Sequence, residues 1–286
     1  VIARWLQKHG YRVAVVPQPN WRDDLRDFRK LGAPRLYFGV NSGAMDSMVN
    51  HYTAAKRLRS DDAYTPEGKA GQRPDYAVTV YTKILKQIYP DIPVIIGGIE
   101  ASLRRVTHYD YWQDALKPSI LVESGADWLC YGMGERTMIE FTRAIESGRN
   151  LNDIRKIPQL GFYMDGRSKA KDAVILNSYE RCCKDKIAFA ENFHVVETYA
   201  NMLQPPVLIE PVGNGFVQIN PTWPPATQEE MDSFWDLPYT KLPHPRYKGK
   251  HIPAFEMIKF SINTHRGCFG GCNFCTIAAH QGKFIQ

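Results

Sequence analysis

The stretch Val94-Ile95-Ile96-Gly97-Gly98-Ile99-Glu100 decides the fold class of this chain. Its short, unbroken apolar run is typical of a parallel strand that is covered by helices on both faces. Two glycines then permit a sharp turn into a helix, at the edge where α/β sheets bind anionic or nucleotide-like groups. Gly97, Gly98 and Glu100 are therefore candidate cofactor-binding residues. A tight turn with only a structural role explains the same glycines equally well.

The same order of strand, glycine turn and helix recurs at residues 127–147. A predicted strand at 127–131 opens through Gly132-Met133-Gly134 into a predicted helix at 135–147. Gly132 and Gly134 are accordingly further candidate cofactor-binding residues. Additional strands are predicted at 11–16, 35–40 and 119–122, and helices at 2–9, 24–31, 45–57 and 76–88. Repeated steps of this kind predict an α/β fold with a doubly wound, mostly parallel, Rossmann-like sheet.

The chain changes character after about residue 150. A helix is predicted at 182–202, and the ten prolines between residues 204 and 253 predict an extended connecting segment with one short helix at 227–235. Residues 255–262 resemble a strand that runs directly into a cysteine loop. We therefore divide the chain into an α/β domain (1–203), a proline-rich connecting segment (204–254) and the start of a further domain (255–286).

Composition narrows the class of protein. The 286 residues carry a formal net charge of +6, but the basic residues are scattered, so nucleic acid binding is permitted without being indicated. No stretch is apolar enough to span a membrane, and the first residues do not read as a signal peptide. Six cysteines, three of them in one loop, do not suit a disulfide framework. We expect a cytoplasmic protein without membrane partners.

The loop near the C-terminal end carries Cys268, Cys272 and Cys275 in the spacing C-x3-C-x2-C. Three thiolates so spaced can bind three irons of a [4Fe–4S] cluster and leave the fourth iron open. Gly267, Gly270 and Gly271 permit the tight backbone turns of such a loop. These cysteines are therefore the candidate metal ligands.

Three other interpretations of this loop stay open. Zinc could be bound by the three cysteines together with His265 or His280, although structural zinc sites usually use paired two-residue knuckles. Cys272 and Cys275 alone could form a redox disulfide, which would leave the third cysteine unexplained. Incidental buried thiols are the last interpretation, but these do not normally cluster with glycines.

Polar and aromatic side chains gather in two N-terminal segments. Arg104 and Arg105, followed by residues 108–112, could bind a phosphate or a flat ring, or could form a surface between domains. Asp46, Asn50 and His51, and the pair Asp61 and Asp62, are similarly suggestive, and helix capping and loop solvation account for them as well.

The cysteine loop resembles that of the radical S-adenosylmethionine (SAM) superfamily, whose motif C-x3-C-x-aromatic-C is matched by Cys268, Cys272, Phe274 and Cys275. Residues 17–21, 43–53, 59–66, 97–105 and 108–112 resemble the YgiQ family of uncharacterised radical SAM proteins. The resemblance implies a [4Fe–4S] cluster, reductive cleavage of SAM, and an electron donor such as flavodoxin or ferredoxin. It implies that Phe274 lies beside the SAM adenine. It names neither a catalytic residue nor a substrate.

The resemblance also implies the architecture around the loop. A partial SAM barrel would continue beyond Gln286, and the N-terminal domain would be similar to cobalamin-binding domains. Cobalamin is a further implied cofactor, but the ligating pattern D-x-H-x-x-G is absent because Gln7 stands where the Asp before His9 should be. Without the remaining barrel we expect the last residues to be poorly anchored. The competing function is a nucleotide- or cobalamin-binding module without catalysis.

Overall fold

The computed structural model describes residues 1–168, 170–272 and 275–286, and it confirms the predicted α/β class. Its centre is a seven-stranded sheet in the order β1-β2-β5-β6-β9-β8-β7, with a separate two-stranded ribbon formed by β3 and β4. The strands are β1 (Phe38–Val40), β2 (Val94–Gly97), β3 (His108–Asp110), β4 (Ala115–Lys117), β5 (Trp128–Cys130), β6 (Leu160–Asp165), β7 (Val174–Ile175), β8 (Leu208–Val212) and β9 (Gly215–Ile219).

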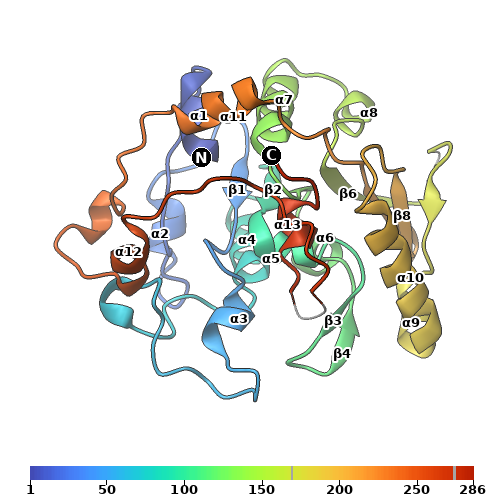
Figure 1. Ribbon diagram of the computed structural model, residues 1–286, viewed down its shortest axis with the longest axis horizontal. Helices are drawn as coiled ribbons and strands as arrows, with labels where there is room; N and C mark the ends of the chain where they lie inside the picture. Colours follow the sequence, from blue (N-terminus) through green and yellow to red (C-terminus); the bar gives the residue numbers. More distant parts are fainter. Residues whose placement is uncertain (169, 273–274) are drawn as a thin grey trace.

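Helices surround this sheet (Figure 1). They are α1 (Ile2–Lys8), α2 (Arg26–Arg29), α3 (Ser47–His51), α4 (Ala77–Ile88), α5 (Gly98–Leu103), α6 (Ile120–Ser124), α7 (Glu135–Glu146), α8 (Leu151–Ile154), α9 (Tyr179–Lys184), α10 (Lys186–Tyr199), α11 (Gln228–Trp235), α12 (Pro253–Ile258) and α13 (Ala278–Gln281), with 3-10 turns at Pro66–Gly68 and Pro245–Tyr247. The predicted helices at 76–88, 135–147 and 227–235 correspond closely to α4, α7 and α11. The predicted helix at 182–202 is divided into α9 and α10.

The sheet is mixed. Strands β1, β2 and β5 are parallel neighbours, as expected of a Rossmann-like core. Strand β6 then runs antiparallel to β5, and β9 runs antiparallel to both β6 and β8. Strand β7 adds a last parallel pairing to β8. The Rossmann-like part of the fold is thus the β1-β2-β5 half, which also carries both glycine turns.

Alternate residues of the central strands pack on opposite faces of the sheet. Val94 and Ile96 join the cluster that includes residues of α4 and α6, whereas Ile95 joins the cluster that includes residues of α7 and α8. In β5, Leu129 packs with the first cluster and Trp128 with the second. The continuous apolar sequence of β2 is therefore explained by helices on both faces.

Two predicted strands were wrong. Residues 11–16 form no strand, and Val15 is 54% exposed, because no neighbouring strand supplies hydrogen-bond partners there. Residues 119–122 begin helix α6 instead. Ser119 caps that helix by accepting a hydrogen bond from Leu121 N, and Gly125 ends it in a left-handed conformation. These two end signals outweigh the β propensity of the apolar run Ile120-Leu121-Val122 between them.

The proline-rich segment at 204–254 was expected to be extended, which is wrong for residues 208–219. These residues form the antiparallel hairpin of β8 and β9, which joins the sheet through β6 and β7. The only proline within the hairpin is Pro211, which lies opposite Phe216 in the register. The division of the chain at residues 203 and 254 stays a prediction, but its middle part supplies two strands to the sheet.

The predicted strand at 255–262 was also wrong. Helix α12 begins at Pro253, a residue that suits the first helical turn because that turn needs no amide donor. Beyond it, Phe260 is 89% exposed and Ile262 is 87% exposed. The alternating apolar residues that predicted a strand therefore find no partner within the described residues. In Figure 1 the chain continues from α12 at one side to α13 at the middle.

Nowhere in the described ranges is there a helix with both the length and the hydrophobicity required to cross a bilayer.

Glu210 is a buried acid within strand β8. Its side chain is 1% exposed, and both carboxylate oxygens accept hydrogen bonds from Thr107 N, at 3.0 and 2.8 Å. Burial raises the pKa of Glu210 from 4.5 to about 7. Strand β8 thereby holds the segment that precedes β3. The contribution of this contact to the free energy of unfolding depends on pH.

We predict that this one residue makes the fold less stable as the pH rises from 4.5 to about 7. Over that range the folded state binds more protons than the unfolded state, so unfolding becomes easier by roughly 3 kcal/mol in total. Urea unfolding at pH 5 and pH 8 should show a smaller loss of stability in Glu210→Gln than in the unsubstituted chain. The exposed control Glu229→Gln should keep the full dependence, and an equal dependence in Glu210→Gln would refute the assignment.

Candidate functional site

The three predicted cluster cysteines lie on a surface loop after α12. All three are free thiols; Cys272 and Cys275 are exposed and Cys268 is half-buried. A Cβ placed on Gly270 would lie 3.5 Å from Cys268 Sγ and 3.7 Å from Cys272 Sγ, so two of the sulfurs lie around that glycine. Phe274, predicted to lie beside the SAM adenine, is outside the described residues.

The described side chains of the cysteine loop have the chemistry, but not the arrangement, of a metal site. Within residues 1–168, 170–272 and 275–286, no group of three or more His, Cys, Asp or Glu side chains is arranged to bind a metal ion. The three thiols themselves suit an iron–sulfur cluster, because none of them is in a disulfide. Gly271 has open space where a Cβ would lie. The loop thus offers the soft sulfur ligands that iron–sulfur clusters require.

An ion pair fixes the start of the cysteine loop to the sheet domain. Arg266 Nη1 lies 2.8 Å from Glu135 Oε1 at the start of α7, and both side chains are more than nine-tenths buried. Arg266 and Gln286 also exchange backbone hydrogen bonds of 3.0 Å in both directions. The expectation that the last residues are poorly anchored was therefore wrong, because charge and backbone pairing hold them without the barrel.

Close backbone approach secures the same segment. Gly267 has a φ of +91°, and a Cβ there would lie 2.0 Å from the carbonyl oxygen of Phe284. The next residue, Cys268, donates its amide to Gly282 O at 3.0 Å. The glycine before the first cysteine is thus required by packing against the returning chain, whereas the sequence suggested only flexible turns around a cluster.

Helix α13 follows the cysteine loop and packs against α5 (Figure 1). Ser102 connects the two: its Oγ donates to Gly98 O at 2.8 Å and accepts from Gly132 N at 3.1 Å. Because the hydroxyl proton is used in this way, His280 Nδ1, 2.9 Å away, is the donor to Ser102. Burial lowers the pKa of His280, which favours the neutral ring.

The two glycine turns have different roles. A Cβ on Gly97 would lie 3.1 Å from Cys130 O, and one on Gly98 would lie 3.2 Å from Asn41 Cβ, so this turn is closed by neighbouring chain. A Cβ on Gly132 would lie 2.8 Å from the Gln159 side chain and 3.3 Å from His280 O. Gly132 therefore lets α13 approach the sheet.

Gly134 also serves close packing. A Cβ on Gly134 would lie 3.0 Å from Cys130 Sγ. The four predicted glycines thus support the fold at this edge, and of the four only Gly132 borders a cavity.

Glu100 does not face an open site, which corrects its prediction as a cofactor ligand. Its side chain is fully buried, and its two oxygens accept hydrogen bonds of 2.9 Å from Ser47 N and Val78 N. These amides lie in the first turns of α3 and α4. Burial, followed by the nearby Asp46, raises the pKa of Glu100. The carboxylate therefore caps two helices, and its full burial leaves no open side for a ligand.

The predicted cluster around Arg104 and Arg105 separates into two parts. Arg104 turns toward α3, where it pairs with Asp46, and Asp46 in turn caps that helix by accepting from Met48 N. Burial, then the charge of Arg104, lowers the pKa of His108 to about 4. These residues have structural roles. Arg105 turns instead toward α13 and Tyr131.

Asp62 and His51, whose roles the sequence did not decide, also have structural roles. Asp62 pairs with buried Arg73 at 3.2 Å, and Arg73 donates to Ser42 O at 2.8 Å. His51 Nδ1 lies 2.8 Å from Asp75, which also accepts from Tyr52. The loop at 58–74 is thus partly internal, with Asp62, Thr65 and Arg73 buried.

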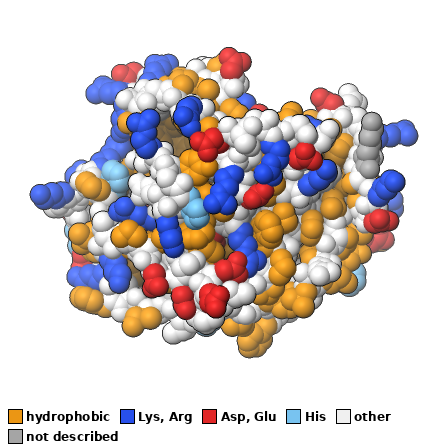
Figure 2. All heavy atoms as spheres, turned by 90° about the horizontal axis from the view of Figure 1, so that it is seen from above, with side chains coloured by type: hydrophobic (Ala, Val, Ile, Leu, Met, Phe, Trp, Pro, Cys, Tyr) orange, Lys and Arg blue, Asp and Glu red, His pale blue; other side chains and the backbone are white. Residues whose placement is uncertain are grey.

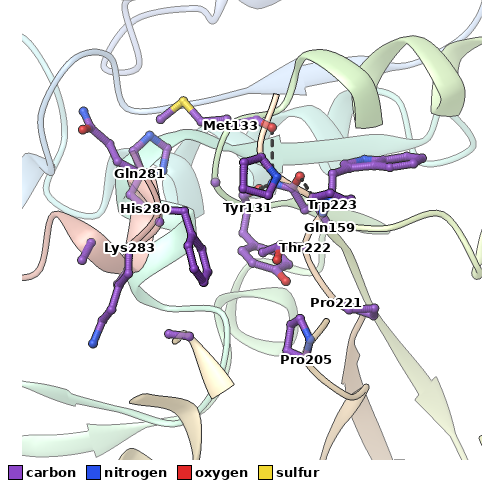
Figure 3. A pocket seen from close by; sticks show the side chains of 18 of the residues that line it. Tyr131, Met133, Gln159, Pro205, Pro221, Thr222, Trp223, His280, Gln281 and Lys283 are labelled. Atoms are coloured by element: carbon purple, nitrogen blue, oxygen red, sulfur yellow. Dashed lines mark hydrogen bonds between the residues drawn. The ribbon is translucent and has the colours of Figure 1, made fainter. Parts of the chain in front are cut away.

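A cavity of about 130 Å³ lies beside α13, and sequence reasoning did not find it. It is bordered by the β5–α7 turn, the segment 220–226 and the C-terminal residues 278–286. In Figure 3, Tyr131 lies between His280 and Lys283 on one side and Pro221 and Trp223 on the other. The sequence signal for this cavity was Trp223, which lies in the proline-rich segment that we predicted to be a connector.

The chain was compared with known proteins. A family model described as Radical SAM N-terminal matches residues 1–261. The whole chain aligns at 55% identity with a UPF0313 protein of Bacteroides thetaiotaomicron and covers 48% of it, and at 56% identity with one of Porphyromonas gingivalis and covers 45% of it. A UPF0313 protein of Geobacter sulfurreducens is 47% identical, with 47% of it covered. The chain thus spans about half the length of these curated relatives. No solved structure matches it.

We predict that Glu100→Gln destabilises the fold by about 2–3 kcal/mol, because the amide group offers one acceptor where two buried N–H donors need partners. Urea unfolding measures the loss. Glu229→Gln, at an exposed helical position, is the matched control and should change stability by less than about 0.5 kcal/mol. Equal stability of the two variants would show that Glu100 is not the common cap of α3 and α4.

We predict that Arg266→Ala releases the C-terminal segment, because buried Glu135 would lose its partner at a cost of about 3–5 kcal/mol. Hydrogen exchange should become faster at the amides of Cys268 and Gln286. Removal of the more exposed arginine of the Arg149–Glu140 pair, by Arg149→Ala, should leave these amides protected. Unchanged protection in Arg266→Ala would mean that the ion pair does not anchor the segment.

Proposed function

The chain belongs to the Radical SAM N-terminal family and to the YgiQ (UPF0313) family, and from this membership we propose that it is part of a radical SAM enzyme. Cys268, Cys272 and Cys275 would bind the [4Fe–4S] cluster. The observation that carries this proposal is the C-x3-C-x2-C loop of free thiols, two of them exposed, on an anchored segment. The loop follows residues 1–261, which the family model matches.

When bound, such a cluster would offer its open iron to the amino and carboxylate groups of SAM and supply the electron for reductive cleavage. The residues of this chain would hold and orient it. Arg266 and Glu135 keep the base of the loop in place, and Gly267 permits its close contact with the returning chain. A flavodoxin or ferredoxin is the proposed class of electron donor. The substrate is not assigned.

Exposed apolar side chains at the end of α12 and just beyond it support the proposal that a further domain of a longer protein covers them. Met257, Phe260 and Ile262 are 79%, 89% and 87% exposed, which is unusual for three apolar side chains so close in sequence. We propose that they are covered by the remaining barrel.

The competing function, a nucleotide- or cobalamin-binding module without catalysis, has less support. The Gly97–Gly98 turn is closed by neighbouring backbone, and Glu100 is engaged with two helices. His9 lacks the Asp of the cobalamin-ligating pattern, because Gln7 stands in its place. We therefore do not propose cobalamin. Figure 2 shows lysine and arginine side chains spread among acidic and hydrophobic ones on this face, which does not favour nucleic acid over small molecules.

We predict that the full-length protein, reconstituted without oxygen, binds about four irons and converts SAM to 5′-deoxyadenosine when reduced. Cys275→Ala should lose the cluster signal in electron paramagnetic resonance and the SAM cleavage, because one of three ligands is removed. Cys183→Ala removes an exposed free thiol outside the loop and is the matched control. Zinc in place of iron, or equal iron content in both variants, would overturn the proposal.

A further inference from the structure

The cavity beside α13 has an apolar wall. It is bordered by prolines and aromatic rings, of which the main ones are Tyr131, Tyr199, Pro221, Trp223, Pro224 and Phe284. Its volume of about 130 Å³ is close to that of engineered cavities of about 150 Å³ that admit benzene. The shape and composition therefore suit a small ligand with an apolar or aromatic body.

Four cations border the same cavity, and three of them are neutralised. The paired ones are Arg136 with Glu230, Arg266 with Glu135, and Lys283 with Glu197. Arg105 has no carboxylate partner among the described residues. Glu197 acts on it only through space while paired with Lys283 at 2.6 Å. A positive charge thus remains on the cavity wall without a matching negative one.

Arg105 is held so that one edge of its guanidinium stays available. The side chain is 9% exposed, and its Nη1 donates to Ser102 O at 2.7 Å and to Ala279 O at 3.3 Å. The ring of Tyr131 lies 5.2 Å from the guanidinium carbon. Nε and Nη2 have no partner among the described residues and are not among the enclosed polar atoms. These two parallel N–H groups match the geometry of a carboxylate.

We propose that this cavity binds a small ligand with a carboxylate on an apolar or aromatic body, and that the Nε and Nη2 atoms of Arg105 bind the carboxylate. A buried guanidinium without a counter-charge is costly, and an anionic ligand removes that cost. The fork of Arg105 favours a planar carboxylate, while the prolines and rings around it favour an apolar body over a hydrated one. The site needs no cluster, since none of Cys268, Cys272 and Cys275 lines it.

The position of the site places this ligand against the segment that carries the cysteine loop. Ala279, which accepts a hydrogen bond from Arg105, belongs to α13, and α13 begins three residues after Cys275. A ligand bound to Arg105 would therefore contact both the sheet domain and α13. Binding at this site would stabilise the docking of α13 on α5.

The test uses the full-length protein and sodium benzoate as the probe, with binding followed by isothermal titration calorimetry. Benzyl alcohol has the same ring without the charge, and inorganic phosphate has charge without the ring. Benzoate should bind saturably, and at least tenfold more tightly than either. Arg105→Gln should weaken benzoate at least tenfold, whereas Arg167→Gln, at an exposed arginine outside the cavity, should not.

A second variant keeps the test valid if loss of Arg105 disturbs folding. Ala200→Leu adds bulk to the cavity wall and leaves Arg105 in place, so it should also weaken benzoate at least tenfold while thermal unfolding stays unchanged. Absence of saturable benzoate binding up to about 10 mM, phosphate binding as tight as benzoate binding, or full benzoate affinity in both cavity variants would overturn the proposal. Because iron is not measured, none of these outcomes depends on the cluster.

Discussion

The buried carboxylate of Glu100 is the interaction on which the first half of the fold depends. It follows strand β2 by three residues and accepts amides from the first turns of both α3 and α4. A negative charge at the N-terminal ends of two helices is favoured by their exposed N–H groups and dipoles. Arg104 and Asp46, which lie beside it, complete a buried polar cluster. The long excursion between β1 and β2 is thereby tied to the sheet at one point.

The second constraint is the attachment of the C-terminal segment. Arg266 pairs with Glu135 at the start of α7, and α13 rests on α5 through Ser102 and His280. Both attachments lie where β2 and β5 end, which is the edge that α/β proteins commonly use for ligands. In this chain the edge is instead occupied by the segment that carries the cysteine loop. The sheet domain therefore acts as the base of that loop.

Because α13 occupies this edge, the cavity lies away from the Gly97–Gly98 turn. The Gly97–Gly98 turn is filled by its neighbours, and the cavity opens on the other side of α13, toward residues 220–226. That segment reaches the cavity because the β8–β9 hairpin places it beside β6. The antiparallel half of the sheet thus supplies one wall of the cavity that Arg105 borders.

The sequence alone determined the α/β class, the strands at β2 and β5, and the cysteine spacing, because each rests on local pattern: an apolar run, a glycine turn, a C-x3-C-x2-C loop. Only the tertiary structure decided the roles of Glu100 and Arg105. The two lie five residues apart in a single polar stretch, yet one caps buried helices and the other faces a cavity. Their surroundings come from residues distant in sequence, such as Ser47, Val78 and Ala279, and burial and partner geometry of that kind cannot be derived from local periodicity.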